Sequence, residues 1–258
     1  MKPRAILLLP LLLTPTLVGP ALVWPAPVRA EVIDPRMEYR SCLTLARQKP
    51  EEGWEEAIAW HSLGGGEPAR HCAAVALIGL GKYEEAARRL EALAGQSRRE
   101  EALRAEMLAQ AGQAWLLAGM PQKALAAQDT ALKLLPGQPD LLLDKAVTLA
   151  NVNHYDEVVG VLDALLRAQP NRIEAMVLRA SAYRYLDKLD LAKDDIARAL
   201  ILDANYADAL LERGIIRRLE GSTIGAREDW LKAIDAAPES SAAEAARRNL
   251  EMMDVKVK

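Results

Sequence analysis

Apolar residues recur along this chain at the three- and four-residue spacing of helices, in segments of about 14 residues separated by short turns. From residue 105 to residue 240 the pattern repeats every 34 residues. Mostly small residues occupy three fixed positions of each unit: Gly112, Ala146, Ala180 and Gly214, then Ala124, Val158, Ala192 and Ala226, then Ala131, Leu165, Ala199 and Ala233. A 34-residue period is typical of helix–turn–helix repeats that stack into a solenoid. We therefore expect an all-α fold in which small side chains let paired helices approach closely.

The two units before the regular array are less uniform. The pattern predicts helices over residues 35–48 and 51–62, and then a second pair within residues 67–96. Ser97 and Glu100 have the spacing of a capping box, which predicts that the next helix runs over residues 98–117.

The regular units begin near residues 105, 139, 173 and 207, and each has a short internal turn. The turns fall at Gly119, Asn153, Asp187 and Gly221. A single helix over residues 240–253, rich in Glu, Arg and Ala, is expected to cap the last pair and keep its outer face polar.

Several segments carry the motif of a known repeat family. Leu80-Gly81-Lys82-Tyr83-Glu84-Glu85-Ala86 matches that family's turn between helices, and Ala226 with Trp230 gives its A-x3-aromatic spacing. Pro136, Pro170 and Pro238 close their units, where Ala204 stands instead in the fifth. The chain thus resembles the tetratricopeptide repeat family over about residues 35–253. This resemblance implies a right-handed α-solenoid with irregular repeats in 31–104, four regular repeats in 105–238, and a capping helix and tail in 239–258.

The first 30 residues have the pattern of an export signal. Met1–Arg4 is positively charged, Ala5–Val23 is apolar, and Val28-Arg29-Ala30 places small residues before a cut at Glu31. The alternative is an uncleaved membrane anchor, although Pro10, Pro15 and Pro20 would interrupt such a helix. We expect a periplasmic protein that is not inserted in the membrane after cleavage.

The charge of the chain mainly excludes one class of partner. The net charge is −3, and 30 basic and 36 acidic residues follow Ala30. Nucleic-acid binding needs clustered positive charge, so no nucleic-acid partner is expected.

Cys42 and Cys72 are the only cysteines, and both fall early in the first helix of successive repeats. Such helices lie side by side, so a structural disulfide is expected in an oxidising compartment. The alternative is a redox or metal site that uses this pair with His61 and His71.

A Cys-x-x-Cys motif, a phosphate-binding loop and a zinc-protease motif are absent from the sequence, so neither catalytic residues nor cofactors are predicted.

The resemblance also implies where a partner would bind, namely on the first helix of each repeat, facing the groove. The predicted groove residues are Gln113, Leu116, Leu143, Val147, Asn151, Val177, Ser181, Arg184, Tyr185, Leu211, Ile215 and Arg218. Arg184, Tyr185 and Arg218 are the favoured anchors, because polar and aromatic groups contribute most at such surfaces. Acidic residues at the second position of these helices disfavour a clamp for a partner's carboxylate.

The sequence predicts a non-enzymatic scaffold that binds a protein or peptide in the cell envelope. A non-catalytic subunit of an envelope enzyme or secretion complex is the other alternative.

Overall fold

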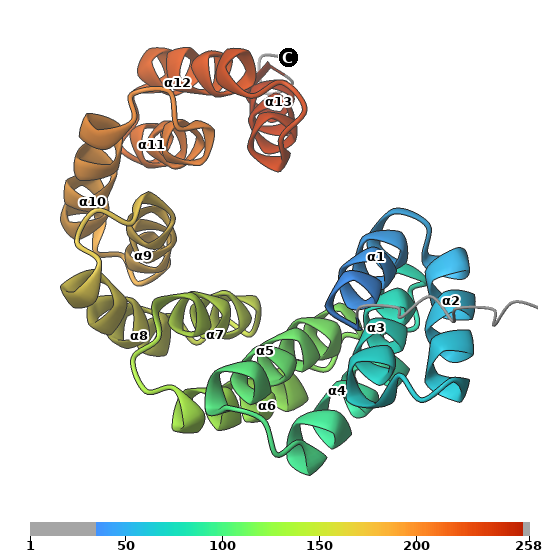
Figure 1. Ribbon diagram of the computed structural model, residues 1–258. Helices are drawn as coiled ribbons and strands as arrows, with labels where there is room; N and C mark the ends of the chain where they lie inside the picture. The colour runs from blue at the N-terminus through green and yellow to red at the C-terminus, as the bar shows by residue number, and fades with distance from the viewer. Residues whose placement is uncertain (1–34, 255–258) are drawn as a thin grey trace, which may run out of the picture. The chain divides into compact units, whose positions relative to one another are not determined.

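Helices fill the part of the chain that the structure describes, residues 35–254 of a computed structural model (Figure 1). The expected export signal lies outside these residues. The helices are α1 (Pro35–Gln48), α2 (Pro50–Ser62), α3 (Gly66–Gly79), α4 (Tyr83–Gln96), α5 (Glu101–Leu117), α6 (Pro121–Leu134), α7 (Pro139–Asn151), α8 (Tyr155–Ala168), α9 (Ile173–Tyr185), α10 (Leu189–Leu202), α11 (Ala207–Leu219), α12 (Thr223–Ala236) and α13 (Ser241–Asp254). No strand occurs between Pro35 and Asp254, so the predicted all-α class is confirmed.

Each odd-numbered helix from α1 to α11 pairs with the even-numbered helix that follows it. We call the first helix of a pair the A helix and the second the B helix. Successive pairs stack, because A helices contact A helices of the next pair: α5 with α7, α7 with α9, and α9 with α11. Figure 1 shows α7, α9 and α11 along the inner side of the bend and α8, α10 and α12 along the outer side.

The turns inside the pairs share one backbone conformation. Asn153 and Asp187 have φ angles of 61° and 58°, and Gly119 and Gly221 have φ angles of 72° and 87°. Glycine enters this left-handed region without strain, and Asn and Asp tolerate it better than other residues. The predicted turn positions are therefore confirmed, and their residue types follow from the φ angle that ends each A helix.

The small residues lie where the A and B helices of one pair meet. Gly112, Ala146, Ala180 and Gly214 are all buried. A Cβ atom on Gly112 would lie 2.9 Å from Cγ of Gln128, and a Cβ atom on Gly214 would overlap the indole of Trp230. The close approach that the sequence predicts is confirmed at these positions.

One predicted helix start is wrong. The first helix of the third pair, α5, begins at Glu101 instead of residue 98, and no side chain caps it. Ser97 does not cap it: its hydroxyl donates a hydrogen bond to Glu67 over 2.9 Å and accepts one from the backbone N–H of Arg99 over 3.1 Å. A contact with the preceding A helix thus competes with the local capping box and prevails.

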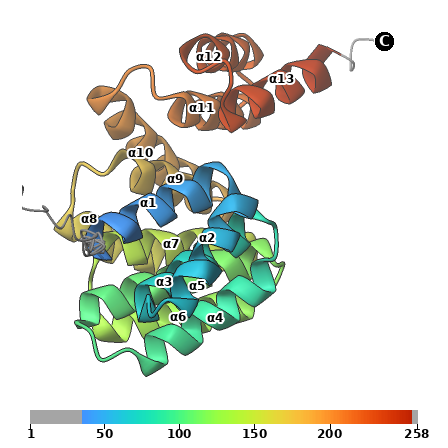
Figure 2. The same ribbon diagram turned by 45° about the vertical axis from the view of Figure 1, so that its right-hand side comes forward.

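The last helix covers the end of the array. Helix α13 packs on α11 and α12 (Figure 2). It buries Ala242, Ala243 and Ala246, while Glu244, Arg247 and Arg248 stay exposed. This arrangement confirms the predicted capping helix.

Candidate functional site

The A helices α7, α9 and α11 enclose a hollow on the inner side of the bend. Its volume is about 360 Å³. The lining residues are Leu143, Val147, Glu174, Val177, Leu178, Ser181, Tyr206, Asp208, Leu211 and Glu212. We call this the central hollow. Five of the twelve predicted groove residues lie in it: Leu143, Val147, Val177, Ser181 and Leu211.

A second hollow adjoins the first near the C-terminal ends of α7 and α9. It has a volume of about 310 Å³ and is lined by Ala150, Asn151, Asn153, Tyr155, Leu178, Ser181, Ala182 and Tyr185. We call it the edge hollow. Leu178 and Ser181 line both hollows, so the two form one continuous surface. Among the predicted residues, Asn151 and Tyr185 join the site here.

Aromatic stacking shapes the edge hollow. The rings of Tyr155 and Tyr185 stack with centroids 4.3 Å apart and an interplanar angle of 5°. The guanidinium of Arg184 lies 4.3 Å from the centroid of the Tyr185 ring. Tyr185 keeps 56% of its surface exposed, so it can still contact a ligand. Tyr155 begins a B helix, and the predicted set, drawn from A helices, left it out.

Arg184 reaches the inner side but is already engaged. Its Nε donates to Oε1 of Glu212 over 2.5 Å, which joins α9 to α11. The side chain of Glu212 is buried, at 7% exposed, and that of Arg184 is nearly so, at 13%. Burial raises the pKa of Glu212, and the charge of Arg184 opposes that rise. Arg184 therefore joins two repeats before it can anchor any partner.

The other predicted residues lie outside both hollows. Gln113 is exposed and donates to Asp144 over 3.3 Å, while Leu116 and Ile215 are half-buried against the core. Arg218 is half-buried and forms no ion pair within residues 35–254. The structure brings seven of the twelve predicted residues together around α7, α9 and α11. The other five do not line either hollow: Gln113, Leu116, Arg184, Ile215 and Arg218.

The lining also contains residues that the sequence did not single out as groove residues. Glu174 and Asp208 lie in the first turns of α9 and α11, where acids complement the helix dipole. Because acids are common at such positions for that reason, the sequence did not indicate that these two line the hollow. Tyr206 precedes α11 and gave no signal in the repeat pattern. Burial raises the pKa of Tyr206, and the charges of Asp208 and Glu174 raise it further.

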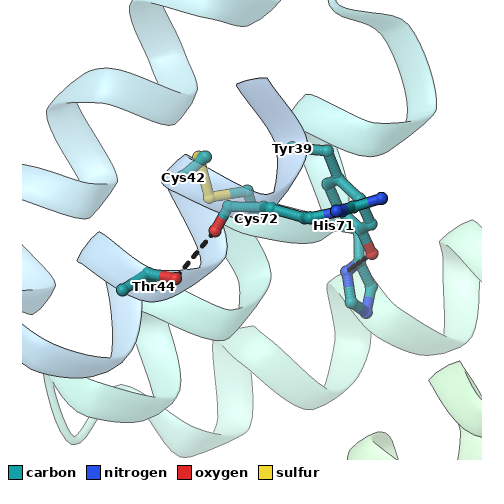
Figure 3. Close-up of a disulfide and its surroundings, with 6 residues drawn as sticks. Tyr39, Cys42, Thr44, His71 and Cys72 are labelled. Carbon is teal, nitrogen blue, oxygen red and sulfur yellow. Dashed lines mark hydrogen bonds between the residues drawn. A yellow bond between two sulfur atoms is a disulfide. The ribbon is translucent and has the colours of Figure 1, made fainter. Parts of the chain in front are cut away.

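The cysteine pair forms a disulfide between α1 and α3, as predicted (Figure 3). Cys42 and Cys72 are buried, at 1% and 0% exposed, so reductants and substrates reach them poorly. His71 points away from the sulfurs. Its Nδ1 lies 2.8 Å from the Tyr39 hydroxyl and its Nε2 lies 2.9 Å from Oε1 of Gln110, so a neutral ring satisfies both contacts. Burial lowers the pKa of His71.

This geometry favours a structural disulfide over a redox or metal site. His61 is exposed on α2, and His71 is engaged with Tyr39 and Gln110. Within residues 35–254, no three or more His, Cys, Asp or Glu side chains gather where they could hold a metal ion. None of the helices between Pro35 and Asp254 has the length and apolar character needed to cross a bilayer.

The fold agrees with solved structures. A tetratricopeptide repeat protein from Parabacteroides merdae superposes with a TM-score of 0.62 at 18% identity, over 84% of this chain and 85% of its own. The described part of this chain has the fold of a tetratricopeptide repeat solenoid. Two further solenoids are similar: MamA from Desulfovibrio magneticus RS-1 has a TM-score of 0.58, 23% identity, and covers 68% of this chain and 97% of its own. YrrB, described as a protein of this repeat class with an unusual peptide-binding site, has a TM-score of 0.53, 20% identity, and covers 74% and 96%.

Comparison with models of protein families and with curated protein sequences yields no match. The likeness to the three solved solenoids concerns the fold, because their identities are low. The inner-side hollows of this solenoid must therefore be interpreted from their own residues.

Proposed function

We propose that this protein is a non-catalytic interaction scaffold that binds a peptide or helix of a partner protein along α7, α9 and α11. The observation that carries this proposal is the continuous surface of the central and edge hollows, which has aliphatic side chains at its centre and aromatic and amide groups at one edge. Aliphatic side chains and backbone amides of a peptide are complementary to such a surface. YrrB, a similar solenoid, carries a peptide-binding site by its description.

A paired capture experiment tests this function. The purified protein and a Val177→Ser, Leu211→Ser variant are used as baits in extract of the native cell envelope. Both residues line the central hollow and are half-buried, so their loss removes apolar contact area without opening the core. We expect the variant to lose the proteins that the wild type retains.

A matched control separates loss of the groove from a general change in surface. Ile201 is 83% exposed on the B helix α10 and lies outside both hollows. Ile201→Ser should retain the same proteins as the wild type. If the hollow variant also retains them undiminished, the proposed binding surface is wrong.

We further propose that the scaffold acts in the cell envelope after removal of residues 1–30. The disulfide supports this, because such bonds persist in oxidising compartments. The test is the intact mass of the protein from fractionated cells of its source. A periplasmic chain that begins at Glu31 is expected, whereas a membrane-bound chain that retains Met1 would establish the anchor instead.

A further inference from the structure

Carboxylates, and no lysine or arginine, contribute the charged side chains of the central hollow: Glu174, Asp208 and Glu212. Glu212 is neutralised by Arg184. Oε2 of Glu174 lies 3.1 Å from Nε of Arg172, but Nη2 of Arg172 also lies 3.0 Å from Oδ1 of Asp140. One guanidinium is therefore shared between two carboxylates.

Asp208 lacks a counter-ion altogether within the described residues. It is exposed in the first turn of α11, and no ion pair or side-chain hydrogen bond joins it to another residue there. Tyr206 lies beside these acids: burial raises its pKa, the charges of Asp208 and Glu174 add to that rise, and the charge of Arg172 opposes it. Basic side chains of the described residues therefore do not fully balance the negative charge of the central hollow beside its aliphatic floor.

Val177, Leu211 and Leu143 form this floor, and all three are half-buried. An apolar side chain can bury itself there. Acidic flanks on that side chain would meet Asp208 and Glu174 and be repelled, and neutral flanks would leave both carboxylates without a partner. A Lys or Arg can lay its aliphatic stem along the apolar floor while its charged end reaches the carboxylates.

We propose, on the basis of the proposed function, that the bound segment carries a Lys or Arg close to a Leu, Ile or Val. The aliphatic side chain packs on Val177 and Leu211, and the cation lies between Asp208 and Glu174. The preferred partner is therefore a protein with a basic, aliphatic segment. The edge hollow, with Tyr185 and Asn151, accommodates the continuation of that segment.

Selection from a random dodecapeptide library displayed on phage tests this partner class on the purified protein. We expect enriched peptides to contain Lys or Arg near an aliphatic residue more often than the unselected library. Asp208→Lys should reverse the preference towards Asp or Glu and weaken the peptides selected on the wild type by about tenfold or more. Added salt should weaken binding of those peptides to the wild type, because the contact is partly exposed.

Glu228→Lys is the matched control, since it changes the net charge by the same amount on the exposed face of α12. It should leave the selected peptides and their affinities unchanged. If Asp208→Lys impairs folding, as judged by circular dichroism, Asp208→Asn replaces it and should weaken the same peptides and lessen their salt dependence.

The two proposals fail in different ways. Peptides whose binding is lost in Val177→Ser but which show no preference for Lys or Arg would overturn the charge inference and leave the scaffold function standing. A charge preference that persists unchanged in the Asp208 variants would do the same. If no enriched peptide is weakened by Val177→Ser, the proposed groove function itself falls.

Discussion

The first three helices, α1 to α3, and the last three pairs, α7 to α12, stack in different ways. The apolar cluster shared by α1, α2 and α3 buries small side chains, namely alanines with Cys42 and Cys72. From α7 to α12 the core contains leucines, isoleucine, methionine and Trp230. Less apolar area is removed from water in the first region, so hydrophobic burial contributes less there. The disulfide stabilises the region with the smaller core.

Charges follow the same division. Ion pairs in residues 35–96, such as Lys49 with Glu52 and Arg89 with Glu85, join exposed residues three or four positions apart in sequence. In the regular repeats, some ion pairs join different helices and bury the acid: Arg179 binds Asp195, which is 3% exposed, through two contacts of 2.7 Å. Hydrogen bonds to Asp195 raise the pKa of Arg179. Exposed pairs add little stability, whereas these buried pairs fix how one helix lies on the next.

The largest expected effect comes from removing the disulfide. Cys42→Ala with Cys72→Ala should lower the free energy of unfolding by about 3–4 kcal/mol in the chain-entropy model, for a 30-residue separation. Because repeats contact only their neighbours, the loss should be local. Hydrogen exchange read by mass spectrometry should show lost protection in α1–α3 and unchanged protection in α9–α12. Equal loss along the whole chain would mean that the two regions do not differ as described.

The buried ion pairs come next. Asp229 is fully buried and binds Arg213 over 2.6 and 2.9 Å and Arg217 over 2.8 Å. Asp229→Asn should cost about 2 kcal/mol, because two arginines lose a charged acceptor. Denaturant unfolding measures the change, and Asp235→Asn, exposed on the same helix, should alter stability by less than about 0.5 kcal/mol. Equal effects would show that the charges between helices are incidental.

The close contact of α11 with α12 gives a somewhat smaller expected effect. Gly214→Ala places a methyl group against the rigid, buried indole of Trp230 and should cost about 1–3 kcal/mol. Gly160→Ala is the control, because nothing lies within 4 Å of its added Cβ and it is a helical position. That change should stabilise by about 0.5–1 kcal/mol. Thermal unfolding of both variants would show whether the sign depends on packing.

The smallest expected effect concerns pH in the first region. Burial lowers the pKa of His71 below its ordinary value of 6.5, so the neutral ring is the folded form. Stability associated with His71 is therefore present above pH 6.5 and is lost as the pH falls through the lowered pKa. His71→Gln should flatten this part of the dependence of Tm on pH. An identical slope in wild type and variant would indicate that carboxylates alone determine it.

The fold was predictable from sequence because the determinants repeat. Small residues such as Ala180 and turn residues such as Asp187 recur at one spacing, and each has a local physical cause in packing or in the φ angle. The disulfide was predictable for the same reason, since Cys42 and Cys72 occupy equivalent places in successive A helices. Ser97 was misinterpreted because its partner, Glu67, lies 30 residues away.

The candidate site was predictable only in part. The aliphatic positions Leu143, Val177 and Leu211 follow from the resemblance to the repeat family, and they line the central hollow. The ion pair of Arg184 with Glu212 joins residues 28 positions apart, so no local sequence pattern predicts it. Whether an acid such as Asp208 finds a counter-ion depends on which acids of other helices the nearby arginines already bind. Sequence position gives the face of a helix, but not the allocation of charges across that face.

The bridge formed by Arg179 has a consequence for how such a chain can lengthen. Arg179 binds Asp163 of the preceding pair and Asp195 of its own pair, each 16 residues away. Duplicating a whole unit, for example residues 173–206, would reproduce the Arg179–Asp195 pair in each copy, while Asp163 would pair with the first copy of Arg179 and Glu212 with the second copy of Arg184. An insertion one residue shorter or longer would misalign those partners and separate the small residues from the helices they meet. Growth by complete units would therefore preserve the packing, and the proposed binding surface would lengthen by one helix pair at a time.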